Sequence, residues 1–338
     1  YIDNLHGTIL VPQFFCHTNP IHTFHLYIQI NYIILRPFID LCQQRFPAFI
    51  DTDFQIDSQH LTVSGDGTSV HTHACPCGHH RDGAPDNLRH FSDPDASWGW
   101  DSDLDKYYFG YTLFQLSCYN DELRTDIPLL LRFTNARRHD SVSFLVAFHE
   151  LEKHMPAVSI ENMCLDSAMD NYPTYRLLKK RGIRAFIDLN DKCGRPKTIP
   201  DTITIDKDGT PLCQENLRMK PNGYDKSSGY LMWRCPYGKA HCSKCKNSCT
   251  GSKYGRVVKT RPEWDIRLYT DLPRGTDAYK KIYKQRTATE RINNRILNDY
   301  GLHRMFIHTK EHYSFMTTMI GICIHLDVRY KQQMQAAA

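Results

Sequence analysis

The chain has 338 residues, of which 41% are hydrophobic and 23% are charged, and its net charge is +5. These values are ordinary for a soluble protein long enough to bury a large core. The longest apolar stretch, Phe315 to Leu326, is too short to span a bilayer and contains His325, so we expect no membrane span and no membrane partner.

Cysteine usage indicates the compartment. The thirteen cysteines are clustered and odd in number. With no visible signal peptide, this pattern favours reduced thiols over a disulfide framework, so we expect a cytoplasmic protein. The chain opens at Tyr1 without Met, so we expect that part or all of an N-terminal region is missing.

Apolar patterning predicts the elements in chain order. Residues 1–58 read as helices packed on a main domain, of which residues 59–190 form the first part. The predicted strands are 61–65, 107–116, 127–133, 160–165 and 184–189, and the predicted helices are 141–154 and 172–181. This order is typical of an α/β, ribonuclease H-like domain, which is a mixed sheet flanked by helices.

The remaining chain divides in two. Residues 191–276 are rich in Gly, Pro and Lys and read as a basic, Cys-rich insertion. Helical periodicity returns at 277–298 and again near 309–330, so we expect residues 277–330 to complete the main domain. The insertion therefore interrupts the fold just before the helix that carries Glu290.

Three acidic residues, Asp66, Asp166 and Glu290, are the candidate catalytic groups. Asp66 and Asp166 each end a predicted strand, and active residues of α/β sheets belong at carboxyl strand ends. Taken singly, Asp66 also suits a turn before Gly67, and Asp166 suits a helix N-cap. Together the three carboxylates suit a two-metal site for cutting phosphodiester bonds.

The chemistry of such a site requires a cation. Two carboxylates about 4 Å apart repel by roughly 4 kcal/mol at an effective dielectric constant of 20. Hard oxygen ligands suit Mg²⁺ or Mn²⁺, so we expect Asp66, Asp166 and Glu290 to bind one of these ions. On the predicted helix, Tyr283, Arg286 and Glu290 fall within roughly 60° of arc, although Arg286 and Glu290 also match an ordinary i,i+4 surface ion pair.

An ordered series of motifs resembles the DDE-class insertion-sequence transposases, in the branch with a Tyr-x2-Arg-x3-Glu-x6-Lys signature. The resemblance covers about residues 60–325. The matching stretches are Gly65-Asp66-Gly67-Thr68, 91–96, Gly99-Trp100-Asp101, 108–111, His139-Asp140-Ser141, 165–170, 187–190, 272–275 and Tyr283-x2-Arg286-x3-Glu290-Arg291. One departure is that Leu297 stands where the signature expects Lys, and Arg291, Arg295 and Arg304 are the candidate replacements.

The resemblance implies a function. Asp66, Asp166 and Glu290 match the catalytic triad, and Tyr283 and Arg286 match the residues beside the glutamate. The implied activity is metal-dependent cutting of double-stranded DNA at transposon ends and joining of the 3′-hydroxyl to target DNA. It also implies a homodimer on DNA and a prokaryotic, nucleoid-associated setting. The resemblance also leads us to expect that Arg291 contacts a DNA phosphate.

A second candidate DNA contact lies in the insertion. From Arg218 to Arg261 there are eleven Lys or Arg and one acid, a net charge of +10, which leaves −5 for the rest of the chain. Tyrosines and Trp233 interleave with these cations, as suits a phosphate backbone with splayed bases. Lys244, Lys246 and Lys253 are candidate phosphate contacts, and Trp264 is the preferred tryptophan for stacking on an extruded base. The alternative is a solvated basic loop.

Two Cys/His clusters are candidate zinc sites. Cys235, Cys242, Cys245 and Cys249 offer four thiolates at short spacing, with Cys213 and His241 as spare ligands. A second cluster, at 71–80, contains His and Cys residues just after Asp66. Free thiols in a basic loop remain the alternative for the first cluster. Structural Zn²⁺ at either would stabilise a loop that has little core of its own.

Three functions therefore remain open. The first is the DNA transposase. The second is a ribonuclease H-like nuclease that cuts without strand transfer, which needs the same acids. The third is a zinc-stabilised nucleic-acid-binding protein with inert carboxylates.

Overall fold

A computed structural model of the chain describes residues 61–72, 93, 95–101, 104–121, 123–156, 158–190, 198–238, 245, 249–305 and 307–337. The predicted helices at 1–58 and all but His71 of the Cys/His cluster at 71–80 lie outside the described residues. No helix in the described part combines the length and apolarity needed to cross a membrane.

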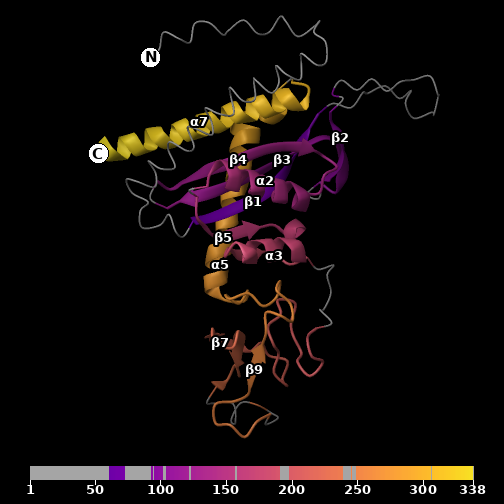
Figure 1. The fold of residues 1–338 in the computed structure, drawn as a ribbon, viewed down its shortest axis with the longest axis vertical. Coiled ribbons are helices and arrows are strands. Elements are labelled where there is room, and N and C mark those ends of the chain that lie inside the picture. The colour runs from indigo at the N-terminus through magenta and orange to yellow at the C-terminus, as the bar shows by residue number, and fades with distance from the viewer. Residues whose placement is uncertain are drawn as a thin grey trace, which may run out of the picture.

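The main body is a six-stranded mixed sheet (Figure 1). Its strands are β1 (Leu61–His71), β2 (Ser97–Asp101), β3 (Lys106–Asn120), β4 (Thr125–Asn135), β5 (Ile160–Leu165) and β6 (Arg184–Ile187). The order is β2-β3-β1-β5-β6, and β4 also pairs with β3. β1 is antiparallel to β3 and parallel to β5, which is parallel to β6.

Helical segments cover the sheet. They are α2 (Asp140–His154), η2 (Ser167–Met169), α3 (Tyr172–Lys180), α5 (Asp277–Tyr283), η5 (Lys284–Arg286), α6 (Thr287–Asn294), η6 (Arg295–Asp299), η7 (Leu302–Arg304) and α7 (Lys310–Ala337). Alternate β3 residues serve two cores because strand side chains alternate between faces. Phe114 and Leu116 pack with Phe144 and Phe148 of α2 in one core.

The other core contains Tyr111 and Leu113 of β3, together with Ile292 of α6 and Ile324 of α7. α2 therefore packs on one face of the central strands and α6 on the other, while α7 contributes Ile324 to the second core and Val328 to the first. The expected mixed α/β sheet flanked by helices is confirmed, and it is compatible with a ribonuclease H-like fold.

The predicted strands 107–116 and 127–133 are longer in the structure and the strand 184–189 is shorter, and two further corrections bear on the site. The first strand does not end at residue 65, because β1 continues antiparallel to β3 as far as His71. The helix predicted at 277–298 is a helical run in which a 3-10 turn, η5, separates α5 from α6, and a π-helical turn, η6, follows. Two features were not predicted: the edge strand β2 and a second sheet within the insertion.

That second sheet has three antiparallel strands, β7 (Lys220–Asp225), β8 (Tyr230–Arg234) and β9 (Val257–Thr260). Leu231 and Trp233 of β8 pack with Val258 of β9 in a small core of their own. Figure 1 shows this sheet at the lower end of the molecule, remote from α7. The basic segment thus forms a small β-sheet as well as loops.

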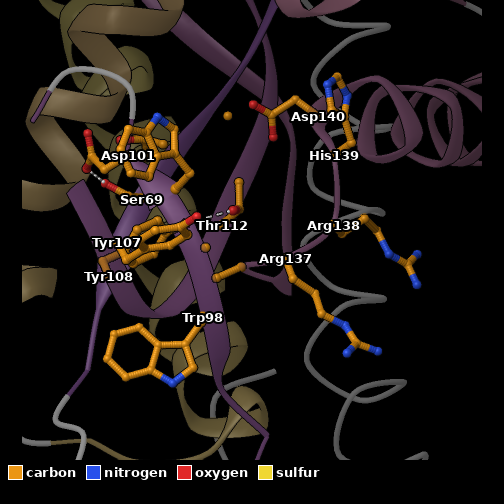
Figure 2. Close-up of a pocket in the computed structure, with 15 residues that line it drawn as sticks. Ser69, Trp98, Asp101, Tyr107, Tyr108, Thr112, Arg137, Arg138, His139 and Asp140 are labelled. Carbon is orange, nitrogen blue, oxygen red and sulfur yellow. Dashed lines mark hydrogen bonds between the residues drawn. The ribbon is translucent and has the colours of Figure 1, made fainter. Parts of the chain in front are cut away.

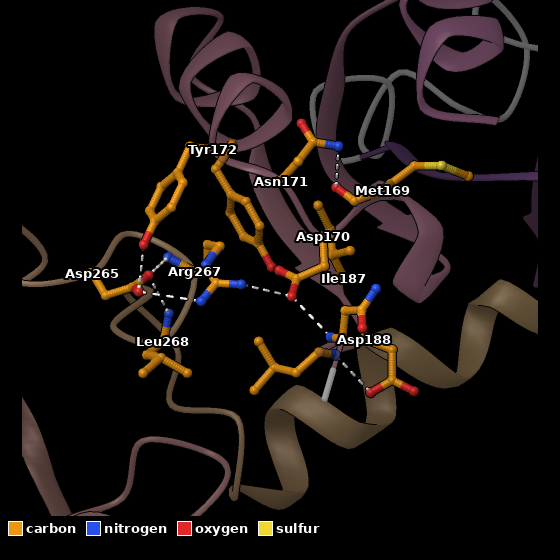
Figure 3. Close-up of polar contacts among 12 residues, drawn as sticks. Met169, Asp170, Asn171, Tyr172, Ile187, Asp188, Asp265, Arg267 and Leu268 are labelled. Atoms are coloured by element: carbon orange, nitrogen blue, oxygen red, sulfur yellow. Dashed lines mark hydrogen bonds and ion pairs between the residues drawn. The ribbon is translucent and has the colours of Figure 1, made fainter. Parts of the chain in front are cut away.

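A buried charge network joins the insertion to the main sheet (Figure 3). Arg267 Nη1 donates to Asp170 Oδ2 at 2.9 Å, and Arg267 Nη2 lies 3.4 Å from Asp265 Oδ2. The Asp265 carboxylate also accepts from the Tyr172 hydroxyl at 2.9 Å. Asp170 follows Asp166 by four residues, so the network fixes the insertion close to the strand end that carries Asp166.

Arg274 makes a second buried connection. Its guanidinium donates to the hydroxyls of Tyr175 on α3 and Tyr279 on α5, each at 2.7 Å. It also donates to the carbonyl oxygen of Arg267, which lies in the insertion. One buried cation therefore holds the end of the insertion, α3 and α5 together, and α5 leads directly into the segment that bears Arg286 and Glu290.

Candidate active site

The end of the β1–β5 pairing brings Asp66 and Asp166 side by side. Gly65 lies opposite Leu165 in the parallel register, and this is the last pair that the two strands form. Asp66 and Asp166 are the next residues on strands that run about 4.8 Å apart. Asp66 is inside β1, but it directly follows the last residue of β1 that pairs with β5. It therefore lies at the same edge of the sheet as the carboxyl end of β5, where Asp166 is.

The helical run from α5 to α6 crosses the same end of the sheet. Thr289 of α6 donates from its hydroxyl to Ser64 Oγ at 2.6 Å, and Gln115 Nε2 donates to the Thr289 carbonyl oxygen at 2.7 Å. Gln115 is the cross-strand partner of Asp66. These buried contacts fix α6 over the part of β1 that carries Asp66.

Arg286 links two of the predicted catalytic acids. Its Nη1 lies 3.1 Å from Asp66 Oδ2, and its Nη2 lies 2.5 Å from Glu290 Oε1. The Asp66 side chain is 18% exposed and the Glu290 side chain is 48% exposed. The i,i+4 pair expected from sequence is therefore present, and the same guanidinium also reaches Asp66.

The pKa of the Asp66 carboxyl group indicates that its negative charge is poorly compensated by its surroundings. The pKa of Asp66 is raised to about 7, chiefly by burial and then by the neighbouring Asp166 carboxylate, while Arg286 and the Gly67 N–H act to lower it. A bound cation would favour the ionised form of such a carboxyl group. The site thus has an acid whose charge Arg286 alone does not compensate.

A fourth carboxylate, Asp140, was not among the predicted catalytic residues. It is the first residue of α2 (Figure 2), and its carboxylate lies so close to Gly67 that a Cβ atom there would come within 2.6 Å of Asp140 Oδ1 and displace it. Burial raises the pKa of Asp140, the Asp166 carboxylate adds to this, and His139 opposes it. The His139-Asp140-Ser141 motif drew attention to this turn, but its spacing gave no sign of proximity to Asp66.

Tyr283 lies close to the same charges. Burial raises the pKa of its hydroxyl, Asp188 and Asp166 raise it further, and Arg286 opposes them. Its ring stacks on Tyr279 with centroids 6.2 Å apart. The hydroxyl therefore stays protonated and keeps a hydrogen to donate.

The donor atoms near Asp66 are of the chemical type that suits a hard divalent cation. Asp66, Asp166 and Asp140 supply carboxylate oxygens, the ligands that Mg²⁺ and Mn²⁺ prefer. In this conformation, no three His, Cys, Asp or Glu side chains of the described residues are grouped closely enough to hold one metal ion. Arg286 binds Asp66 and Glu290, so bringing Glu290 to a shared metal requires this guanidinium to move.

The other residues predicted to contact DNA are paired elsewhere, lie in the insertion, or fall outside the described part. Arg291 pairs through two hydrogen bonds of 2.6 Å with Asp126. Trp264 is partly buried, packs on the small insertion core and meets Tyr269 edge-on at 6.2 Å. Lys253 lies 5.3 Å from the centre of the Tyr254 ring. Lys244 and Lys246 lie outside the described residues.

The predicted cysteine ligands are described only in part. Burial raises the pKa of Cys245, and the nearby thiols of Cys235 and Cys249 contribute to the same shift. Cys242 lies outside the described residues, so the set of four is not seen together. The zinc site remains a prediction.

Comparisons with known proteins do not assign the chain to a family. No protein-family model matches the chain, and no curated protein matches it. One similar solved structure is a Drosophila P element transposase strand transfer complex, at 15% sequence identity and a TM-score of 0.19. The similar region covers 49% of this chain and 34% of the P element transposase chain. This chain therefore matches about a third of the length of that transposase. Overlap at this score supports no assignment by itself.

Proposed function

We propose that the chain is a metal-dependent transposase of the DDE class that cuts a phosphodiester bond of DNA and transfers the 3′-hydroxyl. The observation that carries the proposal is the juxtaposition of Asp66 and Asp166 at the end of the β1–β5 pairing, with Arg286 and Glu290 over them. The ordered series of sequence motifs supports the same class, because each of these residues occupies its matching position.

Asp66, Asp166 and Asp140 would hold the metal ions through their carboxylates, and Glu290 would join them once released from Arg286. Two such ions supply Lewis-acid stabilisation of the attacking and leaving oxygens. The partial burial of Asp66 and the closeness of the Asp166 carboxylate favour a bound cation at this site. Without a cation the raised pKa of Asp66 keeps the site partly protonated.

Arg286 and Tyr283 would orient the phosphate. A guanidinium released from two carboxylates can donate two parallel hydrogen bonds to phosphate oxygens. The Tyr283 hydroxyl, which burial keeps protonated, can donate a further one. Both residues lie on the helical run that also carries Glu290, so they would act on the same phosphate.

The direct test is cleavage and joining of DNA that carries the ends of the element encoding this chain, in Mg²⁺ or Mn²⁺. We expect Asp66→Asn, Asp166→Asn and Glu290→Gln each to lose activity by a factor of about a thousand or more, because each removes part of the charge stabilisation. The matched control is Asp299→Asn, an exposed acid on η6. DNA binding should persist in all four variants.

The outcomes separate the three functions. Nicking without joining would favour the ribonuclease H-like nuclease. Binding without cleavage in either metal, or equal activity in all variants, would leave a nucleic-acid-binding protein whose carboxylates are inert.

A further inference from the structure

The outer face of the last helix, α7, carries a line of exposed apolar side chains, which we call the α7 stripe. It consists of Phe315, Met319, Leu326, Tyr330 and Met334, whose side chains are between 38% and 64% exposed. At about 100° per residue, these five positions fall within roughly 100° of arc, so they share one side of the helix. Between Phe315 and Met334, this arc contains no Lys, Arg, Asp or Glu.

The opposite side of α7 already packs on the sheet. Tyr313 and Ile324 are buried in the core that α6 shares, and Val328 is buried in the core that α2 shares. The His325 ring lies 2.8 Å from the Pro128 carbonyl oxygen of β4, measured from Nε2. α7 is therefore apolar on two opposite sides, and only one of them is buried. A continuous exposed apolar surface of this kind indicates that something packs on it.

The start of β1 lies at the same end of the sheet as the C-terminal half of α7. Val63 is opposite Cys118 of β3, and Cys118 is opposite Ile127 of β4. All three residues pack in one core with Val328 of α7. The chain that precedes Leu61 therefore reaches the sheet beside the half of α7 that carries the three most exposed residues of the α7 stripe.

The sixty residues before β1 contain an apolar segment, Phe24–Leu35. Nine of its twelve residues are hydrophobic, and none is Lys, Arg, Asp or Glu. The segment lies outside the described residues, and its sequence predicts that it packs on the main domain. Residues 36–60 can span up to about 80 Å when extended, whereas the 28 residues of α7 are about 42 Å long. The segment can therefore reach any part of the α7 stripe.

The covalent connection favours this segment over a second copy of the chain. A segment joined by a flexible linker acts at an effective concentration of roughly millimolar order. A second copy is present only at the concentration of the protein itself. Unless the protein is highly concentrated, the segment therefore reaches the stripe first.

We propose that the apolar segment Phe24–Leu35 packs along the outer face of α7 in the same molecule and covers the α7 stripe. Neither surface carries a charged group that would lose its water on contact, so the contact is driven by apolar burial. α7 is then held between the sheet on one side and the N-terminal segment on the other. This inference concerns the assembly of the chain and does not rest on the proposed function.

Site-specific photo-cross-linking in the full chain tests the inference. The photoreactive residue p-benzoylphenylalanine is introduced in place of Tyr330, which is 64% exposed, and the linked peptides are identified by mass spectrometry. We expect a link to the 24–35 segment within one molecule, with a yield that does not change on dilution. The matched control places the same residue at Tyr107, which is 70% exposed near the other end of β3 and should give no such link.

Charges introduced into either surface should break the contact. In the chain labelled on α7, the double variants Met319→Lys, Leu326→Lys and Ile30→Lys, Ile33→Lys should each reduce the linked product at least about ten-fold, because each would bury two unpaired ammonium groups. Thermal unfolding checks that the main sheet of each variant is folded.

The charge-matched control is Gln43→Lys, Gln44→Lys, which adds two cations outside the segment and should leave the yield unchanged. An equal loss of product in this control would overturn the inference. So would a yield of the 24–35 link no higher than that from Tyr107. A link between the α7 helices of two molecules, with a yield that rises with concentration, would also overturn it and would identify a second copy as the occupant. None of these measurements uses DNA or metal, so they stand even if the chain does not cut DNA.

Discussion

At the scale of single residues, the environment of Asp66 distinguishes this acid from an ordinary turn residue. Its pKa is raised to about 7, chiefly by burial and then by Asp166. Between the unfolded pKa of about 4 and the folded pKa, the folded protein holds a proton that the unfolded chain has lost. Stability therefore falls as pH rises through this window, and it stays lowered above it.

This sign gives a prediction for metal-free protein. Asp66→Asn does not titrate, so it should gain stability relative to the wild type as pH rises from about 4 to about 7. Thermal unfolding in EDTA across this range measures the gain. Mg²⁺ should stabilise the wild type above pH 7 but have less effect on the variant. A difference between the two proteins that is independent of pH would show that Asp66 is not the titrating group.

Residue identity also explains why Asp140 was missed. The sequence presents it as the start of a helix, beside a histidine that caps that helix. Its relation to Asp66 depends on Gly67, whose missing side chain leaves room for the Asp140 carboxylate. Neither spacing nor periodicity shows which helix start approaches which strand.

At the scale of elements, the buried network around Arg267 decides how firmly the insertion is held. Arg267 is 4% exposed, and the side chains of Asp170 and Asp265 are fully buried. Removing the cation would leave two buried carboxylates without compensation. Such a change typically costs roughly 3–5 kcal/mol, whereas an exposed ion pair contributes roughly 0–1 kcal/mol.

We therefore expect Arg267→Met to lower the free energy of unfolding by roughly 3–5 kcal/mol, as measured by denaturant titration. The control is Arg181→Met, which breaks the partly exposed pair with Glu152 and should cost less than about 1 kcal/mol. The triple variant Asp170→Asn, Asp265→Asn, Arg267→Met should recover part of the loss. Equal costs at Arg267 and Arg181 would mean that the network does not hold the insertion.

Elements were predicted best where the pattern was local. β5 matches its predicted bounds, and α2 and α3 differ from theirs by a single residue at one end. The end of β1 was missed because its last residues, from Asp66 to His71, are held by pairing with β3 rather than by an alternation of their own. β2 was missed because its five residues pair only with the start of β3.

At the scale of the whole molecule, charge is unevenly distributed. The segment from Arg218 to Arg261 has a net charge of +10, and the rest of the chain has −5. The sheet built from this segment lies at one end of the molecule in Figure 1. On that sheet, Lys259 and Arg261 both lie over the Tyr230 ring, at 5.3 and 4.6 Å from its centre. A cationic end of this kind suits a phosphate backbone.

We predict that Lys244→Ala, Lys246→Ala, Lys253→Ala together reduce the salt dependence of binding to a random-sequence duplex. The slope should fall by up to roughly 0.9 for each phosphate that these lysines neutralise in the wild type. The charge-matched control removes Arg176, Lys179 and Lys180, which are exposed on α3. If the two triple variants show the same decrease in slope, the insertion has no special role in binding DNA.

By itself, the sequence determined the α/β class and most element positions, and it nominated Asp66, Asp166 and Glu290 as candidate acids. These follow from local periodicity and from the few residue types that can bind hard cations. Only the tertiary structure decided that Arg286 bridges Asp66 and Glu290, that Asp140 lies against Gly67, and that the Trp98 and Trp100 side chains on the edge strand are about half exposed. Those relations depend on strand register and on close approach at Gly67, which are set by packing between residues far apart in the chain.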